Sequence, residues 1–499
     1  MGKKMSNQFN SIKLILSGLG AAQLVATLNV YLSNLNLYHK MSLIIDAGYF
    51  GVPNKLTLKT LQRIDSAFYG GIFFTVSIGA GLALVSLAMI YLIRKKVTGY
   101  KIYALFFILI WLICLFKLNN NGLCMLETAY FLLIPLVMML ASFKWRPEAD
   151  ASIKKPDIIL FWGSFILLTV LWGTQLTSHL FTDIRDHLLL TNPVGSKIND
   201  FYYKYTLYPA EIFKSLYQKN IKTCDLSKIS NKEIARRLEK KLLGYDYLVL
   251  KNADKVDLKI INKGDHLFLQ NQNQTVIKLT FSEFMSKSSS TLKEFSARLD
   301  KYQFFRMLTF YSLLIGFPII LYWMVFDFFR WLAGLFWDPA IISYIGAGIS
   351  ISIGILLFIP VFSANNSSIS NNTLNANLSS KHWATRMAAL KYIEKKKIEI
   401  SQFPQYKKII TSPYPQERYW LARAFAASHG KNIFNDLLKM LNDPHPNVIC
   451  QTFYALGRQG RPSAKSKIIN AIQTSRHWYC QWYGYRALRK LGWKQTKLK

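Results

Sequence analysis

Residues 71–93 read GIFFTVSIGAGLALVSLAMIYLI, an apolar run without a charged side chain. A helix of roughly 20 mostly apolar residues crosses the ~30 Å hydrocarbon core of a bilayer. This run therefore predicts a membrane span, and the same criterion predicts about seven spans in the whole chain. The other six are residues 12–32, 102–116, 123–143, 158–176, 307–326 and 340–362.

The first of these spans, residues 12–32, has two readings. Polar residues interrupt it, and Lys3 and Lys4 precede it, as in the basic region of a signal peptide. Its apolar core continues past Ala22 without an obvious cleavage site, which favours an uncleaved span.

Outside the spans the chain is strongly basic. Its 499 residues carry a formal net charge of +35 although 51% are hydrophobic, and from Lys381 onward 23 Lys and Arg face 5 Asp and Glu. The abundant aromatic and aliphatic residues exclude a disordered chain. Five cysteines exclude a disulfide scaffold. The basic tail is either a solvated domain or a surface for anionic lipid head groups or an acidic protein.

Short basic loops predict the orientation. Bases gather between the second and third spans and between the fourth and fifth: Arg94, Lys95, Lys96, Lys101, Lys144, Arg146, Lys154 and Lys155. Such loops stay cytoplasmic. We therefore expect a protein of the plasma (inner) membrane with a cytoplasmic N-terminus. Residues 177–306 and everything after Phe362 are then extracytoplasmic, which disfavours nucleic acid as the partner.

The C-terminal quarter contains an internal repeat. Four similar helical phrases begin at His382, Arg418, Pro446 and Trp478, and the third follows an Asp443-Pro444-His445-Pro446 turn. Proline cannot continue a helix but can start one. Aligning the small residues of the phrases makes four alanines equivalent, at spacings of 37, 29 and 32 residues: Ala389, Ala426, Ala455 and Ala487.

These phrases resemble the HEAT-like repeat in the short form first known from phycobilisome lyases, over about 110 of the 499 residues. The arginine early in the second helix of that repeat matches Arg386 and Arg423, whereas the third unit has Gln451. The resemblance implies an α-solenoid of stacked helix pairs with an extended binding face. It does not imply lyase chemistry, because most such repeats bind proteins.

Bases and aromatic side chains of the repeats are the candidate binding residues. The crowded last unit has a second reading, in which its aromatic side chains cap the repeats. Cys450 and Cys480, about one repeat apart, are expected to be buried residues. The binding candidates are Arg386, Arg423, Arg458, Trp478, Trp482, Tyr483, Arg486 and Arg489.

Residues 177–306 predict a small α+β insert. A helix over 230–243 begins with Ser230 as N-cap and Glu233 three residues later. A second helix over 282–306 leads to the sixth span. Short strands are predicted between the two helices, at residues 245–250, 256–261, 266–270 and 276–280.

Asp186, His187 and Glu211 are weak catalytic candidates in this insert. They could form a polar site for a lipid-linked substrate, or they could belong to an amphipathic helix beside the membrane. The sequence contains no P-loop, dinucleotide fingerprint, nucleophile elbow or HExxH motif. Its histidines lack metal-ligand spacing, so no metal and no cofactor is predicted.

The sequence thus predicts a mainly α membrane protein with about seven transmembrane helices, an extracytoplasmic α+β insert and a C-terminal α-solenoid. Its expected function is that of a scaffold or assembly factor whose basic repeats bind a protein partner. The alternative is a membrane enzyme or transporter acting on a lipid or lipid-linked substrate through the insert. The predicted domains are residues 1–176, 177–306, 307–362, a Ser/Asn-rich linker at 363–380, and 381–499.

Overall fold

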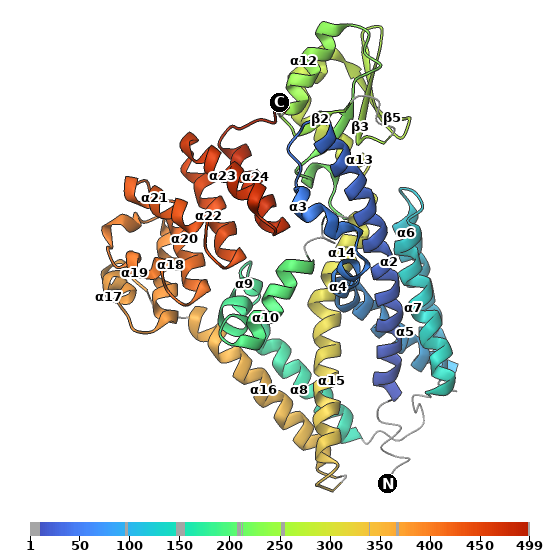
Figure 1. Ribbon diagram of the computed structural model, residues 1–499. Coiled ribbons are helices and arrows are strands. Elements are labelled where there is room, and N and C mark those ends of the chain that lie inside the picture. Colours follow the sequence, from blue (N-terminus) through green and yellow to red (C-terminus); the bar gives the residue numbers. More distant parts are fainter. Residues whose placement is uncertain are drawn as a thin grey trace. The chain divides into compact units, whose positions relative to one another are not determined.

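The computed structural model describes residues 10–94, 98–145, 155–206, 211, 213–250, 255–338, 340–365 and 369–497. It is mostly helical, with one five-stranded sheet (Figure 1). The chain divides into two compact units, each built from three separate segments. The membrane unit comprises Met1–Leu32, Ile64–Leu188 and Lys301–Ser363. The composite unit comprises Ser33–Arg63, Leu189–Asp300 and Ala364–Lys499.

Within the described residues, six helices are long and apolar enough to cross a membrane. These helices indicate a membrane protein. They are Asn10–Asp46, Ile64–Arg94, Ile102–Asn119, Met125–Lys144, Gln303–Ala333 and Ile342–Ala364. The remaining predicted span, residues 158–176, corresponds to a shorter apolar helix, Asp157–Gly173.

Two of the long helices contain a π-helical turn. The elements of this unit are α2 (Asn10–Asp46), α4 (Ile64–Phe74), η2 (Thr75–Gly79), α5 (Ala80–Arg94), α6 (Thr98–Asn119), α7 (Met125–Lys144), α8 (Lys155–Gly173), α9 (Leu180–Ile184), η3 (Arg185–Leu189), α14 (Gln303–Tyr311), η6 (Ser312–Gly316), α15 (Phe317–Ala333) and α16 (Ile342–Asn365). Of these, α2 and α16 continue into the composite unit.

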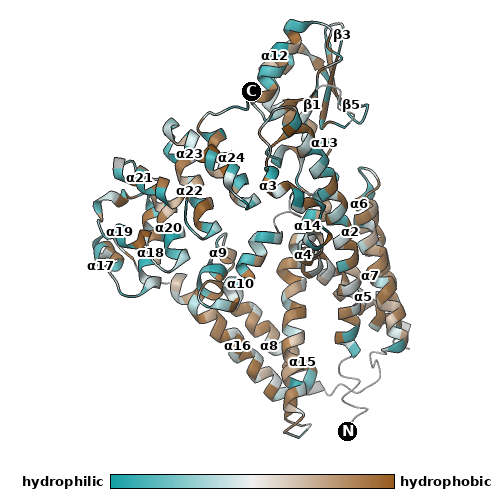
Figure 2. Cartoon of the chain, in the orientation of Figure 1, coloured by the Kyte–Doolittle hydropathy of each residue, from teal (hydrophilic) through white to brown (hydrophobic). Residues whose placement is uncertain are grey.

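The long helices of the membrane unit consist mainly of hydrophobic residues (Figure 2), and many of their large apolar side chains are exposed. In α6, Leu105 is 68% exposed and Phe116 is 72% exposed, as expected for a surface solvated by lipid. Small residues allow close helix contact. A Cβ on Gly81 would lie 2.2 Å from Oγ of Ser312, so α5 and η6 pack nearly backbone to backbone.

The sheet of the composite unit has the order β2-β1-β3-β4-β5. β1 pairs in parallel with β2 and β3, and the last three strands are antiparallel. The elements are β1 (Lys222–Asp225), α12 (Lys232–Leu243), β2 (Tyr247–Val249), β3 (Leu258–Lys263), β4 (His266–Asn271), β5 (Gln274–Thr280) and α13 (Phe281–Arg298).

Four of these strands are the predicted ones, and β1 was missed. The predicted N-cap of α12 is corrected by one position. The side chain of Asn231, not Ser230, accepts hydrogen bonds from the N–H groups of Glu233 and Ile234. The helix predicted over residues 282–306 ends with α13 at Arg298, and α14 begins separately at Gln303.

The C-terminal part of the composite unit consists of four helix pairs. The second helices α18, α20, α22 and α24 pack on one another in that order. The elements are η7 (Asn371–Thr373), α17 (Leu374–Leu378), α18 (Trp383–Lys396), η8 (Ile400–Gln402), α19 (Tyr406–Ile410), α20 (Pro415–Phe425), α21 (Lys431–Met440), α22 (Pro446–Gln459), η9 (Pro462–Ala464), α23 (Lys465–Thr474) and α24 (Trp478–Lys490).

Two segments that look unremarkable in the sequence complete this core. Residues 374–378 of the predicted linker form α17, whose Leu374 and Leu378 are buried in it. The segment after α2 contributes Phe50 and Leu61 and contains the short helix α3 (Lys55–Leu58) and the 3-10 turn η1 (Lys59–Gln62). The composite unit is therefore built by all three of its chain segments.

The insert is joined to the helix pairs by three short elements. They are α10 (Pro193–Phe201), η4 (Tyr202–Thr206) and η5 (Leu216–Gln218). Tyr203 packs against Tyr479 of α24, with ring centroids 5.3 Å apart. Cys450 and Cys480 are buried, as predicted, and their sulfur atoms lie 3.7 Å apart.

Candidate functional site

The second helix of each C-terminal pair is preceded by the same short turn. A Ser or Asp side chain accepts a hydrogen bond from the backbone N–H two residues later, where the helix starts. The four contacts are His382 to Ser380 at 3.1 Å, Tyr414 to Ser412 at 3.2 Å, His445 to Asp443 at 2.8 Å and His477 to Ser475 at 3.1 Å.

These turns correct the predicted alignment of the repeats. The four N-cap residues are His382, Tyr414, His445 and His477, at nearly constant intervals of 31 or 32 residues. Ala455 and Ala487 occupy equivalent places after their caps, but Ala389 and Ala426 do not. The alanines do not align the repeats correctly, because a small residue is tolerated at several buried positions of a helix.

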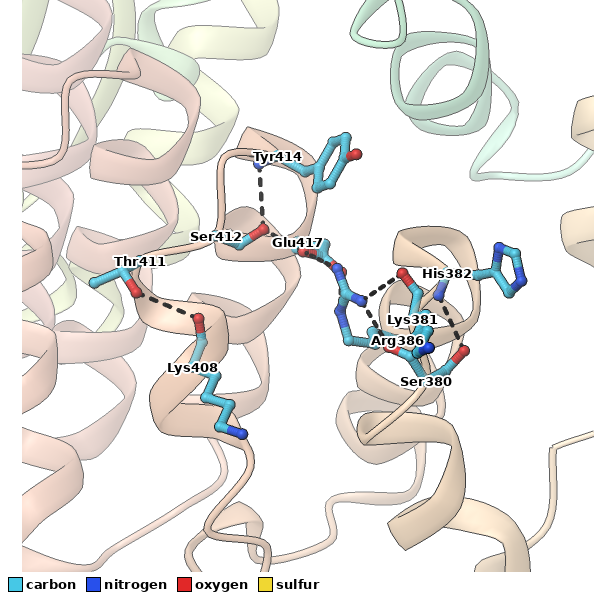
Figure 3. Close-up of polar contacts among 9 residues, drawn as sticks. All are labelled: Ser380, Lys381, His382, Arg386, Lys408, Thr411, Ser412, Tyr414 and Glu417. Atoms are coloured by element: carbon cyan, nitrogen blue, oxygen red, sulfur yellow. Dashed lines mark hydrogen bonds and ion pairs between the residues drawn. The ribbon is translucent and has the colours of Figure 1, made fainter.

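Arg386 joins the first helix pair to the second (Figure 3). Its Nε donates to Oε1 of Glu417 at 2.7 Å, and its Nη1 donates to the carbonyl of Ser380 at 2.6 Å. The Glu417 carboxylate is fully buried and also accepts a hydrogen bond from Ser412. The guanidinium of Arg386 therefore donates its hydrogen bonds to groups within the chain, so Arg386 has a structural role.

The same arrangement recurs one repeat later. Arg418 is four residues past its N-cap, like Arg386, and it donates to Asp443 and to the carbonyl of Ser412. Arg423, the predicted equivalent, instead donates to Glu394 at 2.6 Å. The predicted repeat arginine at Arg423 is thus replaced by Arg418.

Bases and aromatic rings line one face of the second helices. Arg423 lies over Tyr454 at 5.6 Å from the ring centroid, and Arg458 and Lys490 lie over the same ring at 6.0 and 5.9 Å. Arg486 lies over Trp482 at 4.6 Å. We call Tyr454, Arg458, Arg486 and Lys490 the basic face.

The cations of the basic face are not neutralised. Within the part of the chain that the structure describes, Arg458, Arg486 and Lys490 make no ion pair with a carboxylate. All three are exposed. Partial burial, with repulsion from Arg458 and Arg486, lowers the pKa of Lys490. Such crowding favours an anion at this face.

The other aromatic candidates mainly hold the last helix in place. Trp478 is buried in the core. Tyr479 stacks on Trp482 with centroids 6.2 Å apart and meets Tyr483 edge to face at 4.9 Å. This supports the reading in which the aromatic side chains cap the repeats.

A cavity of about 520 Å³ lies between the insert and α24, within the composite unit. We call it the lysine pocket, because bases dominate its lining. Arg489 pairs there with Asp246 at 2.7 Å. The basic residues of the lining are Lys214, Lys219, Lys222, Arg486 and Arg489, and Trp482 lies among them.

Two lysines of the pocket have a lowered pKa. Lys222 is 7% exposed, and its burial lowers its pKa to about 8 although Asp246 and Asp257 oppose the shift. Burial likewise lowers the pKa of Lys219, with Lys40 adding to the effect. Both ammonium groups would be stabilised by an anion in the pocket.

The three catalytic candidates are divided between the two units. Asp186 and His187 lie in the π-helical turn η3, where Asp186 is fully buried and pairs with Arg185 at 2.6 Å. Glu211 belongs to the composite unit and pairs with Lys214 at 2.6 Å. Both carboxylates thus have a neighbouring base as partner.

The lysine pocket includes residues that sequence reasoning missed. Trp482, Arg486 and Arg489 were candidates, but Lys214, Lys219 and Lys222 were not. No local pattern marks these lysines, since their role depends on α24, more than 250 positions away in the sequence. Among the described residues, no group of three or more His, Cys, Asp or Glu could hold a metal ion.

No protein-family model matches this chain. No curated protein and no solved structure matches it either. The geometry of the composite unit is therefore the basis for the functional argument.

Proposed function

We propose that this protein is a membrane-anchored scaffold whose composite unit binds an acidic protein partner through the basic face. The observation that carries this proposal is a set of three exposed cations without a carboxylate partner among the described residues: Arg458 and Lys490 lie over Tyr454, and Arg486 lies over Trp482. Arginines and aromatic rings are enriched among the residues that dominate protein interfaces.

The resemblance to HEAT-like repeats supports this function. In such repeats stacked helix pairs present an extended face to a partner, and here α18, α20, α22 and α24 pack in sequence order. The basic face lies on the last two of these helices. A Cβ on Gly457 of α22 would lie 3.0 Å from Cα of Ala487 of α24. These two helices therefore pack closely, and the face is held in shape before a partner arrives.

The composite unit also supports the expected topology. Its three segments fold together, so they must lie on one side of the membrane. Segments on one side are separated by an even number of crossings. Between the first and second segments this requires α8 to cross, together with Ile64–Arg94, α6 and α7. We infer seven crossings, with the N-terminus opposite the composite unit.

The charge of the loops supports an assignment of each segment to one side of the membrane. The bases between α5 and α6 favour a cytoplasmic location for that loop, which makes the composite unit extracytoplasmic in an inner or plasma membrane. The alternative function, an enzyme or transporter acting on lipid, is less well supported. Asp186 and Glu211 each pair with a base, which disfavours a general base at either position.

Site-specific photo-crosslinking in intact cells tests the proposed function. A photoreactive amino acid at Tyr454 should give a defined crosslinked protein, and the same probe at Lys439 should not. Lys439 is a good control because its side chain is 76% exposed on α21, away from the basic face. Arg458→Glu combined with Lys490→Glu should abolish the crosslink at Tyr454, because reversed charges repel an acidic partner. An unchanged crosslink in that double variant would refute the proposal.

A further inference from the structure

We propose that the lysine pocket binds a phosphate ester, through the ammonium groups of Lys219 and Lys222 and the guanidinium of Arg486. The lysine pocket is a different site from the basic face, and this proposal does not depend on the proposed protein partner. Arg486 is the one residue that the two sites share.

The pocket contains more positive charges than its acidic residue can pair with. Five bases line it, and its one acidic residue, Asp246, pairs with Arg489. Lys214 is paired with Glu211. Within the described residues, Lys219, Lys222 and Arg486 have no carboxylate in ion-pair contact. Three positive charges thus share one cavity with no carboxylate of the described residues in contact, and Asp246, Asp257 and Glu211 only partly offset the lowered pKa of the two lysines.

The burial of Lys222 makes its positive charge unfavourable unless an anion offsets it. Lys222 is almost fully buried, and the one acceptor of its ammonium group among the described residues is the carbonyl of Lys219, at 3.2 Å. It also lies 5.1 Å from the ring centroid of Tyr247. A buried ammonium group needs an anion or several acceptors to offset its lost hydration. A bound anion would supply both the negative charge and the hydrogen-bond acceptors.

Further donors specify the kind of anion. The Nε1 group of Trp482 is buried and has no hydrogen-bond acceptor among the described residues. The guanidinium of Arg486 lies against the same indole, 4.6 Å from its centroid, and Lys214 lies 4.8 Å from it. A phosphoryl group has three acceptor oxygens and up to two negative charges, so it can meet several such donors together.

The size of the pocket favours an ester over inorganic phosphate alone. A volume of about 520 Å³ lies within the range of small-molecule sites. The Trp482 ring offers an apolar surface for the alcohol part of the ligand. The phosphate could belong to a soluble metabolite or to a lipid head group, which share this chemistry.

Calorimetric titration of the full chain tests the proposal, with the protein in phosphatidylcholine nanodiscs and glycerol 3-phosphate as probe. We expect saturable binding that Lys222→Met weakens at least tenfold, because one charge-assisted contact is lost. Lys219→Gln should weaken it similarly. Lys439→Met should leave it unchanged, and Arg458→Glu with Lys490→Glu should retain saturable binding. Equal binding by the wild type and both pocket variants would overturn the proposal, as would equally tight binding of succinate.

Folding and ligand source are tested in the same preparations. Lys222→Met removes a buried charge, so its melting temperature without ligand should equal or exceed that of the wild type. Only the wild type should melt higher with glycerol 3-phosphate, and a similar rise in the variant would contradict the assignment. Adding phosphatidic acid to the nanodiscs distinguishes the sources. A weaker apparent affinity for the probe assigns the pocket to a lipid head group, and an unchanged affinity assigns it to a soluble ester.

Discussion

The backbone N–H of Asn54 donates a hydrogen bond to Oε1 of Gln481 at 2.9 Å, across 427 positions of sequence. Gln481 lies four residues past its N-cap, where Arg386 lies in the first repeat, and it also donates to the carbonyl of Ser475 at 2.8 Å. The segment after α2 thus occupies the place that a fifth helix pair would take. It closes the end of the row of repeats.

Replacement of Asn54 should therefore loosen the last repeat. Its side-chain oxygen caps α3, and its Nδ2 donates to the carbonyls of Ile472, Gln473 and Ser475. Asn54→Ala should lower the free energy of unfolding by about 2–4 kcal/mol, from lost caps and unpaired buried carbonyls. Thermal unfolding of the full chain in detergent measures this.

Asn54→Asp separates the contribution of the α3 cap from that of the hydrogen bonds to the three carbonyls. Aspartate retains the cap oxygen but cannot donate to the three carbonyls, so its loss of stability should approach that of Asn54→Ala. Lys55→Ala, at the exposed neighbouring position, should change little. A neutral Asn54→Ala would mean that this segment does not close the repeat.

The Arg386–Glu417 pair should be strongly coupled. Arg386→Met leaves a fully buried carboxylate without its main partner, which costs about 3–5 kcal/mol. Replacing both residues by methionine should cost much less than the sum of the two single changes. Additive single and double effects in chemical denaturation would show that the pair does not join the helices.

The sequence predicted the elements of the fold well where one pattern dominates locally. Apolar runs predicted the spans, and alternation predicted β2 to β5. The pattern missed β1, which reads Lys-Thr-Cys-Asp, because its buried positions are polar and its position depends on β2 and β3. The recurring turns, which begin at Ser380, Ser412, Asp443 and Ser475, are visible in the sequence, but an alignment on the alanines does not find them.

The assembly of the composite unit could not be read from the sequence. Contacts such as Asn54 with Gln481 join segments separated by several spans, and neither side carries a local signature. For the same reason the lysine pocket was only half predicted. The cluster of aromatic residues in the last repeat makes Trp482 and Arg486 candidates from the sequence. Lys219 and Lys222 become candidates only when the fold places them beside α24.

The affinity for glycerol 3-phosphate should fall as the pH rises from 7.5 to 9.5. Its phosphate is a dianion throughout this range, because its second pKa is about 6. The pKa of Lys222 is about 8 without ligand, so the pocket loses a positive charge as the pH rises. Affinity should then fall toward tenfold per pH unit above about 8. The charged groups around Lys222 are Lys40, Lys219, Asp246, Asp257 and Arg489.

Lys222→Met provides the control for this pH dependence. Lys40 pairs with Asp257, and Arg489 pairs with Asp246, and the substitution leaves both pairs in place. The variant should show a shallower decline, with Lys219 as the remaining lysine whose pKa is lowered. Parallel declines in both proteins, measured by the same titration, would show that Lys222 does not contact the phosphate.

The most direct test of the account is the side of the membrane on which each segment of the composite unit lies. Single cysteines at the exposed positions Lys55, Lys232 and Lys439 represent its three segments, and Asp338 represents the turn between α15 and α16. An impermeant maleimide applied to intact cells or spheroplasts, with the unsubstituted chain as background, should label the first three and leave Cys at 338 unlabelled until the membrane is opened. Labelling of positions 55 and 232 from opposite sides would contradict a composite unit built from three segments on one side.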